Sequence, residues 1–293
     1  MNLVPEYVDK LCEEIEYTGK IVQRMGLVLD TVYFGGGTPT TLEAYQLEKI
    51  MKTIAKSFDM TNVREYTVEA GRADTITEEK LRTIKANGCT RISVNPQTLN
   101  DSVLEAIGRK HTAKQFFDSF ELARNVGFDS INTDIIAGLP TDTVDSFKAT
   151  VDKLIEMGPE NITVHTLSIK RAARLNRGEN EDVLENPAAD MVEYATKALL
   201  ENGYKPYYLY RQKYMSGSFE NVGWSREGLD CLYNIYMMEE VHTIVSVGGG
   251  SISKVNLPDG KLVRFPNPKF PEQYIEMIED VLAKKEEMFA LMG

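Results

Sequence analysis

The sequence predicts an α/β fold in which parallel strands alternate with helices on the outside. A strand, a helix and a helix-ending glycine recur roughly every 30 to 35 residues between Thr31 and Gly203. In addition, the short apolar strand 31–34 runs directly into Gly35-Gly36-Gly37, as in a strand-to-helix turn. Such alternation makes the strands parallel, either in a doubly wound sheet or in a barrel.

The elements of this alternation follow from apolar periodicity and from capping signals. Strands are predicted at 31–34, 64–69, 90–95, 130–136 and 161–167. Helices are predicted at 5–24, from Leu42, from Thr77, at 102–107, from Thr112, around 147–155 and from Pro187. Thr40 and Thr41 are candidate caps of the helix that starts near Leu42. Thr112 and Gln115 form a capping-box pattern before their helix.

Beyond Gly203 the pattern changes, because irregular loops rich in Gly and Asn separate the strands. Strands are predicted at 204–210, 241–247 and 262–265, and a final charged helix at 270–291. We therefore expect two domains, a barrel-like α/β domain over residues 1–203 and a C-terminal α+β extension over residues 204–293.

Composition and charge exclude several classes of protein. With 33 Lys+Arg against 44 Asp+Glu, the net charge of −11 argues against nucleic-acid binding. No apolar run reaches the roughly 20 residues that span a bilayer, and the N-terminus lacks the pattern of a signal peptide. Cys12, Cys89 and Cys231 are odd in number and far apart, so we expect reduced thiols of a cytoplasmic protein and no metal cluster.

The glycine-rich turn is the first candidate binding site, because its backbone N–H groups suit a carboxylate, a phosphate or a ribose. Polar residues also stand at or just after the ends of the other candidate strands, where a parallel α/β fold binds its ligands. The candidates are Gly36, Gly37, Thr38, Glu69, Gln97, Asp134 and Ser168. For each residue alone, a helix cap or a loop hydrogen bond is the alternative role.

Two basic stretches give a second group of candidates. Arg171 and Arg174 follow the strand at 161–167, and Arg211 follows the strand at 204–210. In so acidic a chain these arginines are candidates for binding a polycarboxylate, because a planar guanidinium binds carboxylates bidentately. Solvated surface charge is the alternative role.

Several motifs resemble a known family. They are YFGGGTPTTL at 33–42, TVEAGRAD at 67–74, RISVNPQT at 91–98, GRKHT at 108–112, NTDIIAGLP at 132–140 and ENVGWSREGLDCLYNIYMM at 220–238. Together they resemble the radical S-adenosylmethionine enzymes of the oxygen-independent coproporphyrinogen III oxidase type. The resemblance covers nearly the whole chain and is greatest to the coproporphyrinogen dehydrogenase branch of Gram-positive anaerobes.

The resemblance implies a fold, a cofactor and a reaction. The fold is an incomplete (β/α)6 radical S-adenosylmethionine barrel, a partial TIM-like barrel that lacks its first strand. In the family, a 4Fe–4S cluster cleaves S-adenosylmethionine reductively, and the resulting radical starts oxidative decarboxylation of tetrapyrrole propionates to vinyl groups in haem biosynthesis. The residues that match the family's S-adenosylmethionine positions are Gly36, Gly37, Thr38, Glu69, Gln97, Arg109, Asp134 and, by ungapped alignment, Ser168.

The implied substrate and partners follow from the same chemistry. Arg171, Arg174 and Arg211 are expected to hold the propionates of the tetrapyrrole, and no residue is assigned a catalytic role. The expected electron donor is a protein such as flavodoxin or ferredoxin. A haem chaperone of the same superfamily is the alternative function, although the TVEAGRAD and YNIYMMEE segments favour the dehydrogenase. A barrel without radical chemistry is a third alternative.

The chain departs from the family at its N-terminus. The family's CxxxCxxC cluster loop precedes sequence like Leu3-Val4-Pro5-Glu6-Tyr7, and here the chain begins at Met1, so the cluster ligands are absent. Because the other ligand residues are intact, we expect a fragment of a longer protein; a variant that has lost the radical chemistry is the alternative. We expect the chain by itself to be inactive and to self-associate through the open edge of the barrel.

Overall fold

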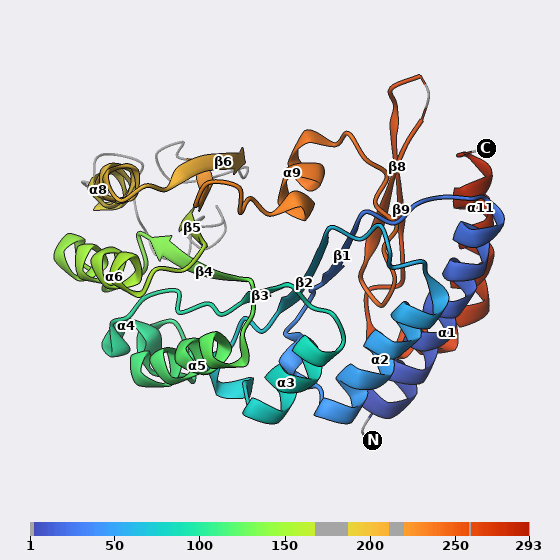
Figure 1. Ribbon diagram of the computed structural model, residues 1–293, viewed down its shortest axis with the longest axis horizontal. Helices are drawn as coiled ribbons and strands as arrows, with labels where there is room; N and C mark the ends of the chain where they lie inside the picture. The colour runs from blue at the N-terminus through green and yellow to red at the C-terminus, as the bar shows by residue number, and fades with distance from the viewer. Residues whose placement is uncertain (1–2, 168–186, 211–219, 258, 293) are drawn as a thin grey trace, which may run out of the picture. The chain divides into compact units, whose positions relative to one another are not determined.

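The computed structural model describes residues 3–167, 187–210, 220–257 and 259–292 (Figure 1). The chain divides into two compact units, each built from more than one segment of the sequence. Unit 1 comprises Met1–Val68, Glu78–Cys89 and Leu232–Gly293, and unit 2 comprises Glu69–Thr77 and Thr90–Cys231. The domain boundary predicted after Gly203 stays a prediction; unit 2 runs through that position.

Unit 1 combines two parallel strands with helices and a hairpin. β1 and β2 pair in parallel, with Thr31 beside Glu65 and Phe34 beside Val68. β8 and β9 form an antiparallel hairpin. The elements are α1 (Val4–Arg24), β1 (Thr31–Phe34), the 3-10 helix η1 (Pro39–Thr41), α2 (Ala44–Ser57), β2 (Glu65–Glu69, its last residue counted in unit 2), α3 (Glu78–Ala86), α9 (Leu232–Glu239), β8 (Ile252–Asn256), β9 (Leu262–Pro266), α10 (Pro271–Glu276) and α11 (Ile278–Ala290).

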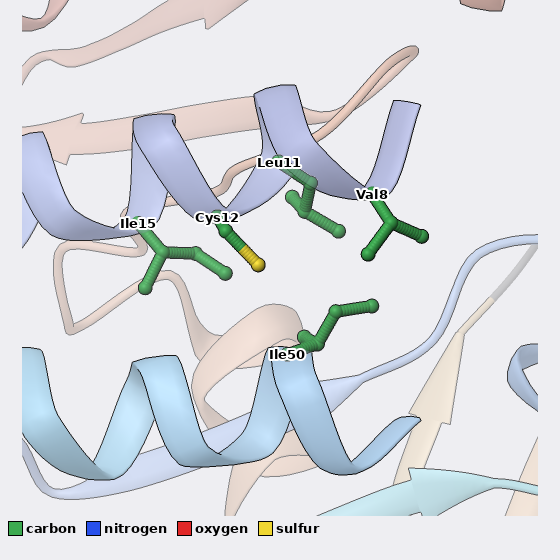
Figure 2. Close-up of a cluster of buried hydrophobic side chains, with 5 residues drawn as sticks. All are labelled: Val8, Leu11, Cys12, Ile15 and Ile50. Carbon is green, nitrogen blue, oxygen red and sulfur yellow. The ribbon is translucent and has the colours of Figure 1, made fainter. Parts of the chain in front are cut away.

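One part of the unit 1 core lies between α1 and α2. Figure 2 shows Val8, Leu11, Cys12 and Ile15 on one face of α1, together with Ile50 of α2. The four α1 positions follow the i, i+3, i+4, i+7 spacing, so they form a single apolar stripe along the helix. Cys12 packs here as a small apolar side chain, and burial raises the pKa of its thiol.

A buried polar network joins α1 to the C-terminal part of unit 1. The fully buried Glu14 carboxylate accepts hydrogen bonds from the Gly248 backbone N at 2.7 Å and the Tyr274 hydroxyl at 2.5 Å. Its other oxygen accepts from the Asn267 amide at 2.8 Å and lies 3.1 Å from Lys285 Nζ. A buried carboxylate needs such compensation for its lost hydration. The network therefore ties α1 to α10, to α11 and to the turn at Gly248.

Unit 2 contains a sheet with the strand order β3-β4-β5-β7-β6. β3, β4 and β5 are parallel, whereas β7 runs antiparallel to both β5 and β6. The elements are η2 (Ala73–Thr75), β3 (Arg91–Ser93), α4 (Asp101–Ala106), α5 (Ala113–Val126), β4 (Ser130–Ala137), α6 (Val144–Met157), β5 (Asn161–Thr166), α8 (Pro187–Glu201), β6 (Lys205–Tyr210) and β7 (Asn221–Ser225).

The parallel strands of unit 2 have one apolar face and one polar face. Side chains alternate between the two faces along a strand. Ile131 and Ile135 of β4 are fully buried on the apolar face. The alternate positions of β3, β4 and β5, and of the residues just after β3, are polar: Ser93, Asn95, Asn132, Asp134, Thr163 and His165. This second face, which we call the polar face, carries the candidate site.

Most of the predicted strands and helices are confirmed, but the predicted start of α2 is wrong. Thr40 and Thr41 do not cap this helix, because they lie in η1. Glu43 is the N-cap residue instead, and its backbone N donates to Gln46 Oε1 at 2.9 Å in a capping box. The predicted capping box of Thr112 and Gln115 is present at the start of α5.

The C-terminal region differs more from the prediction. The strand predicted at 241–247 is wrong, since its pairing is an isolated bridge between Ile244 and Lys254. The helix predicted at 270–291 is divided at Met277 into α10 and α11. β7, β8 and α9 were not predicted. α9 is apolar on several sides and buries none of its residues, so its sequence lacks the one-sided periodicity that identifies a helix.

Candidate functional site

The glycine-rich turn of unit 1 is accessible to a ligand. Gly36 and Gly37 are exposed just after β1, and Thr38 is half-buried. Gly36 has φ = +108°, a conformation that glycine adopts without strain. A Cβ atom added at Gly36 or Gly37 would meet no other atom within 4 Å. The turn therefore leaves space beside its backbone, as a backbone-binding site requires.

In unit 2, Asp134 is the centre of a polar network. Its Oδ2 accepts a hydrogen bond from Asn95 Nδ2 at 2.8 Å, and its Oδ1 accepts one from Asn132 Nδ2 at 2.8 Å. The Asp134 backbone N in turn donates to Asn95 Oδ1 at 3.2 Å. His165 Nε2 of β5 lies 3.9 Å from Oδ2. Residues from three adjacent parts of the sheet thus hold one carboxylate, whose side chain is still 21 % exposed.

Asp134 keeps its negative charge in this environment. Burial acts to raise the pKa of this carboxyl group, but interactions with His165, Asn132 and Thr163 outweigh burial and lower the pKa below its ordinary value. At neutral pH Asp134 is therefore a hydrogen-bond acceptor. Because each carboxylate oxygen can accept more than one hydrogen bond, Asp134 can also bind a hydroxyl or an ammonium group of a ligand.

Gln97 lies beside Asp134 and has an unusual backbone conformation. Its backbone N donates to the Asp134 carbonyl oxygen at 3.0 Å, and its own carbonyl oxygen accepts from Ile136 N at 2.9 Å. Gln97 has φ = +66° and is 8 % exposed. The left-handed conformation costs a residue with a Cβ about 1–2 kcal/mol. Strain of this kind is concentrated at functional sites, where surrounding contacts maintain it.

Among the residues predicted from the sequence, the structure brings Gln97 and Asp134 into contact. Glu69 is half-buried at the end of β2, and Arg109 is half-buried just after α4. Both belong to unit 2, whereas the turn at Gly36 belongs to unit 1. The remaining candidates, Ser168, Arg171, Arg174 and Arg211, lie outside the described residues, and their predicted roles stay predictions.

Three members of the Asp134 network were missed in the sequence, namely Asn95, Asn132 and His165. The pattern that marks these residues in the sequence is an alternation with a period of two. Polar residues occupy every second position of the strand, and an apolar or small residue stands between them. Asn132 precedes Asp134 by two positions and therefore lies on the same face of β4. A polar alternation on adjacent strands that are otherwise rich in Ile and Val would have identified this face.

The described residues fit S-adenosylmethionine and do not fit an iron–sulfur cluster. In unit 1 the open backbone at Gly36 suits a carboxylate. In unit 2, taken by itself, the anionic Asp134 suits an ammonium or a hydroxyl group. Cys12, Cys89 and Cys231 are each buried. In the described part of the chain, no three His, Cys, Asp or Glu side chains gather in a way that could hold a metal ion.

The described helices do not meet the requirements of a membrane span. None of them is both long enough and apolar enough to cross a bilayer.

The chain as a whole is similar to known proteins. Residues 4–154 match the Radical SAM superfamily, and the chain belongs to that superfamily. Its members use S-adenosylmethionine and a 4Fe–4S cluster. The family predicted from the sequence motifs is thereby confirmed.

Within the superfamily, two curated relatives show how far the similarity extends. The chain is 41% identical over 276 residues to the oxygen-independent coproporphyrinogen-III oxidase-like protein HemZ of Bacillus subtilis. This match covers 93% of this chain and 55% of HemZ. It is 33% identical over 208 residues to the heme chaperone HemW of Lactococcus lactis. That match covers 70% of this chain and 53% of HemW. The chain thus spans about half the length of these relatives.

A solved structure confirms the fold. Coproporphyrinogen III oxidase (HemN) of Escherichia coli matches with a TM-score of 0.70 at 22% identity, over 94% of this chain and 63% of HemN. HemN is a radical SAM enzyme. The predicted α/β fold, a partial radical SAM barrel with a C-terminal extension, is therefore confirmed.

Proposed function

We propose that this chain is the barrel part of an oxidoreductase of the coproporphyrinogen dehydrogenase type. The reaction is oxidative decarboxylation, in which a propionate side chain loses carbon dioxide, one hydrogen atom and one electron and becomes a vinyl group. The observation that carries the proposal is the 41% identity to HemZ over 93% of the chain. HemZ is named an oxidase-like protein of this chemistry, and the similarity includes the strands that bear the candidate site.

The arrangement around Asp134 supports this proposal. A bound S-adenosylmethionine would supply the hydrogen-abstracting radical, and this chain's own residues would bind and orient it. Asp134 of unit 2 would accept hydrogen bonds from its hydroxyl or ammonium groups. Asn95 and Asn132 fix the carboxylate rotamer of Asp134, so that the acceptor is oriented before the ligand binds.

A haem chaperone is the second candidate function, because HemW of Lactococcus lactis is 33% identical over 70% of the chain. The two functions differ in ligand. A dehydrogenase must bind a reduced tetrapyrrole with free propionates and change it, whereas a chaperone must bind haem and release it unchanged. The proposal also includes a cytoplasmic location and an electron donor such as flavodoxin or ferredoxin.

Anaerobic turnover of coproporphyrinogen III by the full-length protein tests the proposal, with haem titration as the paired measurement. We expect products in which a propionate has become a vinyl group, with one carbon dioxide released for each. Saturable haem binding, shown by a shift of the haem absorption band, together with no turnover would contradict the proposal and favour the chaperone.

A further inference from the structure

Unit 2 also contains a basic pocket. It has a volume of about 350 Å³ and is lined by Arg72, Ile107, Gly108, Arg109 and Lys110. Arg72 follows β2 and the other four residues follow α4, so two separate loops form its wall. Three of the five side chains are cationic, in a chain whose net charge is −11.

Among the described residues, only part of the positive charge of this basic pocket is paired with an acid. Arg72 is paired with Asp74, through Nε to Oδ1 at 3.1 Å and Nη2 to Oδ2 at 2.5 Å. Neither Arg109 nor Lys110 forms an ion pair or a side-chain hydrogen bond with any described residue. Within the part of the chain that the structure describes, three cations and one carboxylate therefore leave two positive charges without an ion-pair partner. An anionic ligand would supply the missing counter-charge.

The wall of the pocket is held in a fixed shape before any ligand binds. Asp74 engages the Nε edge of Arg72 and thereby orients its guanidinium, leaving Nη1 to donate elsewhere. The backbone N of Arg109 donates to the Leu104 carbonyl oxygen at 2.9 Å, which closes the turn after α4. Such preorganisation reduces the entropy lost on binding.

His111, the residue after Lys110, is a buried histidine. It is 2 % exposed, its Nε2 lies 3.2 Å from the Pro96 carbonyl oxygen, and its Nδ1 is buried without a hydrogen-bond partner among the described residues. Burial is the main cause that lowers the pKa of His111. The Pro96 contact and the charge of Asp74 oppose this effect, whereas the charges of Arg109 and Arg72 add to it. His111 is therefore neutral and adds no positive charge to the pocket at neutral pH.

We propose that Arg72 and Lys110 bind a carboxylate group of the substrate in this basic pocket. The inference rests on the proposed function, under which the carboxylate is a propionate of the tetrapyrrole. Arg109 is the residue that the family resemblance assigns to S-adenosylmethionine, so Arg72 and Lys110 are the substrate-recognising pair. Arginine contributes a planar, directional donor and lysine a mobile charge, a combination that holds a carboxylate on a flexible side chain.

The experiment is a titration of the 293-residue chain with coproporphyrin III, the stable oxidised form of the substrate, and with its tetramethyl ester. Binding is followed by quenching of Trp224, the single tryptophan, which is buried in β7 of the same unit. We expect Arg72→Gln and Lys110→Gln each to weaken coproporphyrin binding by roughly tenfold, the usual effect of losing a charge-assisted hydrogen bond. The ester, which lacks the charge, should bind both variants as it binds the parent.

Lys114→Gln is the matched control. Lys114 is close in sequence to Lys110 but is paired with Asp118 at 2.6 Å, and its side chain is 80% exposed. Its removal changes the net charge as Lys110→Gln does, so it should leave the affinity unchanged. Equal weakening by Lys114→Gln would show a general charge effect and overturn the proposal. Weakened S-adenosylmethionine binding with unchanged coproporphyrin binding in Arg72→Gln and Lys110→Gln would overturn it as well.

A second measurement separates this inference from the proposed function. If the parent binds neither porphyrin, the proposed function fails, and the pocket is tested with tricarballylate, a simple tricarboxylate. Acylation of the Lys110 amine, read by peptide mass, should then be slowed by tricarballylate in the parent and not in Arg72→Gln. If tricarballylate does not slow the acylation of Lys110 in the parent, the proposal of a carboxylate site in this pocket is overturned.

Discussion

The Glu65 carboxylate of β2 accepts a hydrogen bond from the Leu232 backbone N at 2.9 Å, at the first residue of α9. Its other oxygen accepts from Tyr233 N at 3.3 Å. A buried acid on a strand thus satisfies the free N–H groups of a helix that is distant in sequence, and its charge is favourable at the positive end of the helix. The ring of Tyr233 stacks on Tyr33 of β1, with centroids 3.8 Å apart.

Glu65→Ala should therefore loosen the start of α9. We expect a loss of about 1–2 kcal/mol in local stability, as for other lost N-caps. Hydrogen exchange of amides 232–236 measures this loss. Glu239→Ala, at the other end of the same helix, is the control and should leave those amides protected. Unchanged exchange in Glu65→Ala would show that packing alone holds α9.

The pair formed by Asp30 and Arg64 should make the stability of unit 1 depend on pH under acidic conditions. Hydrogen bonds from Arg64 lower the pKa of Asp30 from 3.8 to about 2, against the effect of burial, and Tyr236 contributes a further hydrogen bond. Because the folded-state pKa is lowered, the stabilisation is present above pH 3.8 and is lost as the pH falls toward 2.

Urea unfolding of the parent and of Arg64→Met at several pH values checks this dependence. Both side chains are substantially exposed, so the difference between the two proteins should be at most about 1 kcal/mol above pH 4. It should shrink progressively below that pH. A difference that stays constant from pH 5 to pH 2 would contradict the assignment of the effect to Asp30.

Asp134→Asn should weaken S-adenosylmethionine binding by at least about tenfold, because the variant loses the charge that a ligand ammonium or hydroxyl would contact. Calorimetric titration measures the affinity. Asp118→Asn, on the exposed face of α5, is the control with the same change in charge. If Asp134→Asn remains folded and binds as the parent does, Asp134 is not part of the cofactor site.

Gln97→Gly and Gln97→Ala separate backbone strain from the role of the side chain. Glycine removes the strain of the positive φ, so Gln97→Gly should be more stable than Gln97→Ala by about 1 kcal/mol. Both variants lack the amide, so both should bind S-adenosylmethionine more weakly than the parent. Thermal unfolding and calorimetry give the two quantities. Equal stability of the two variants would mean that Gln97 is not strained.

The sequence predicted the alternating part of the fold well, because its helices are amphipathic and end at glycines. In α1 the apolar stripe from Val8 to Ile15 follows directly from the spacing of the apolar residues along the chain. In α9, by contrast, Leu232, Met237 and Met238 are spread around the helix, and Glu65 holds its first turn from far away in the chain. Local periodicity carries no information about such a contact.

The candidate site was predicted in part for a similar reason. Asp134 was identifiable because a carboxylate among isoleucines is costly unless it is paired. Its partners Asn95 and His165 come from other strands, and the parallel register that aligns them is set by tertiary pairing. The left-handed Gln97 was identified as polar, but its conformation is imposed by hydrogen bonds to β4 and has no signal in the sequence.

The Glu14 network also sets a point in synthesis before which unit 1 cannot complete its fold. Unit 2 is almost continuous in sequence, so most of it can fold as soon as residue 231 has left the ribosome. Glu14 leaves the ribosome 260 positions before its partner Tyr274. Until then the Glu14 carboxylate must remain hydrated and the apolar side of α1 incompletely covered. The burial of α1 is therefore complete only after α10 and α11 have been synthesised.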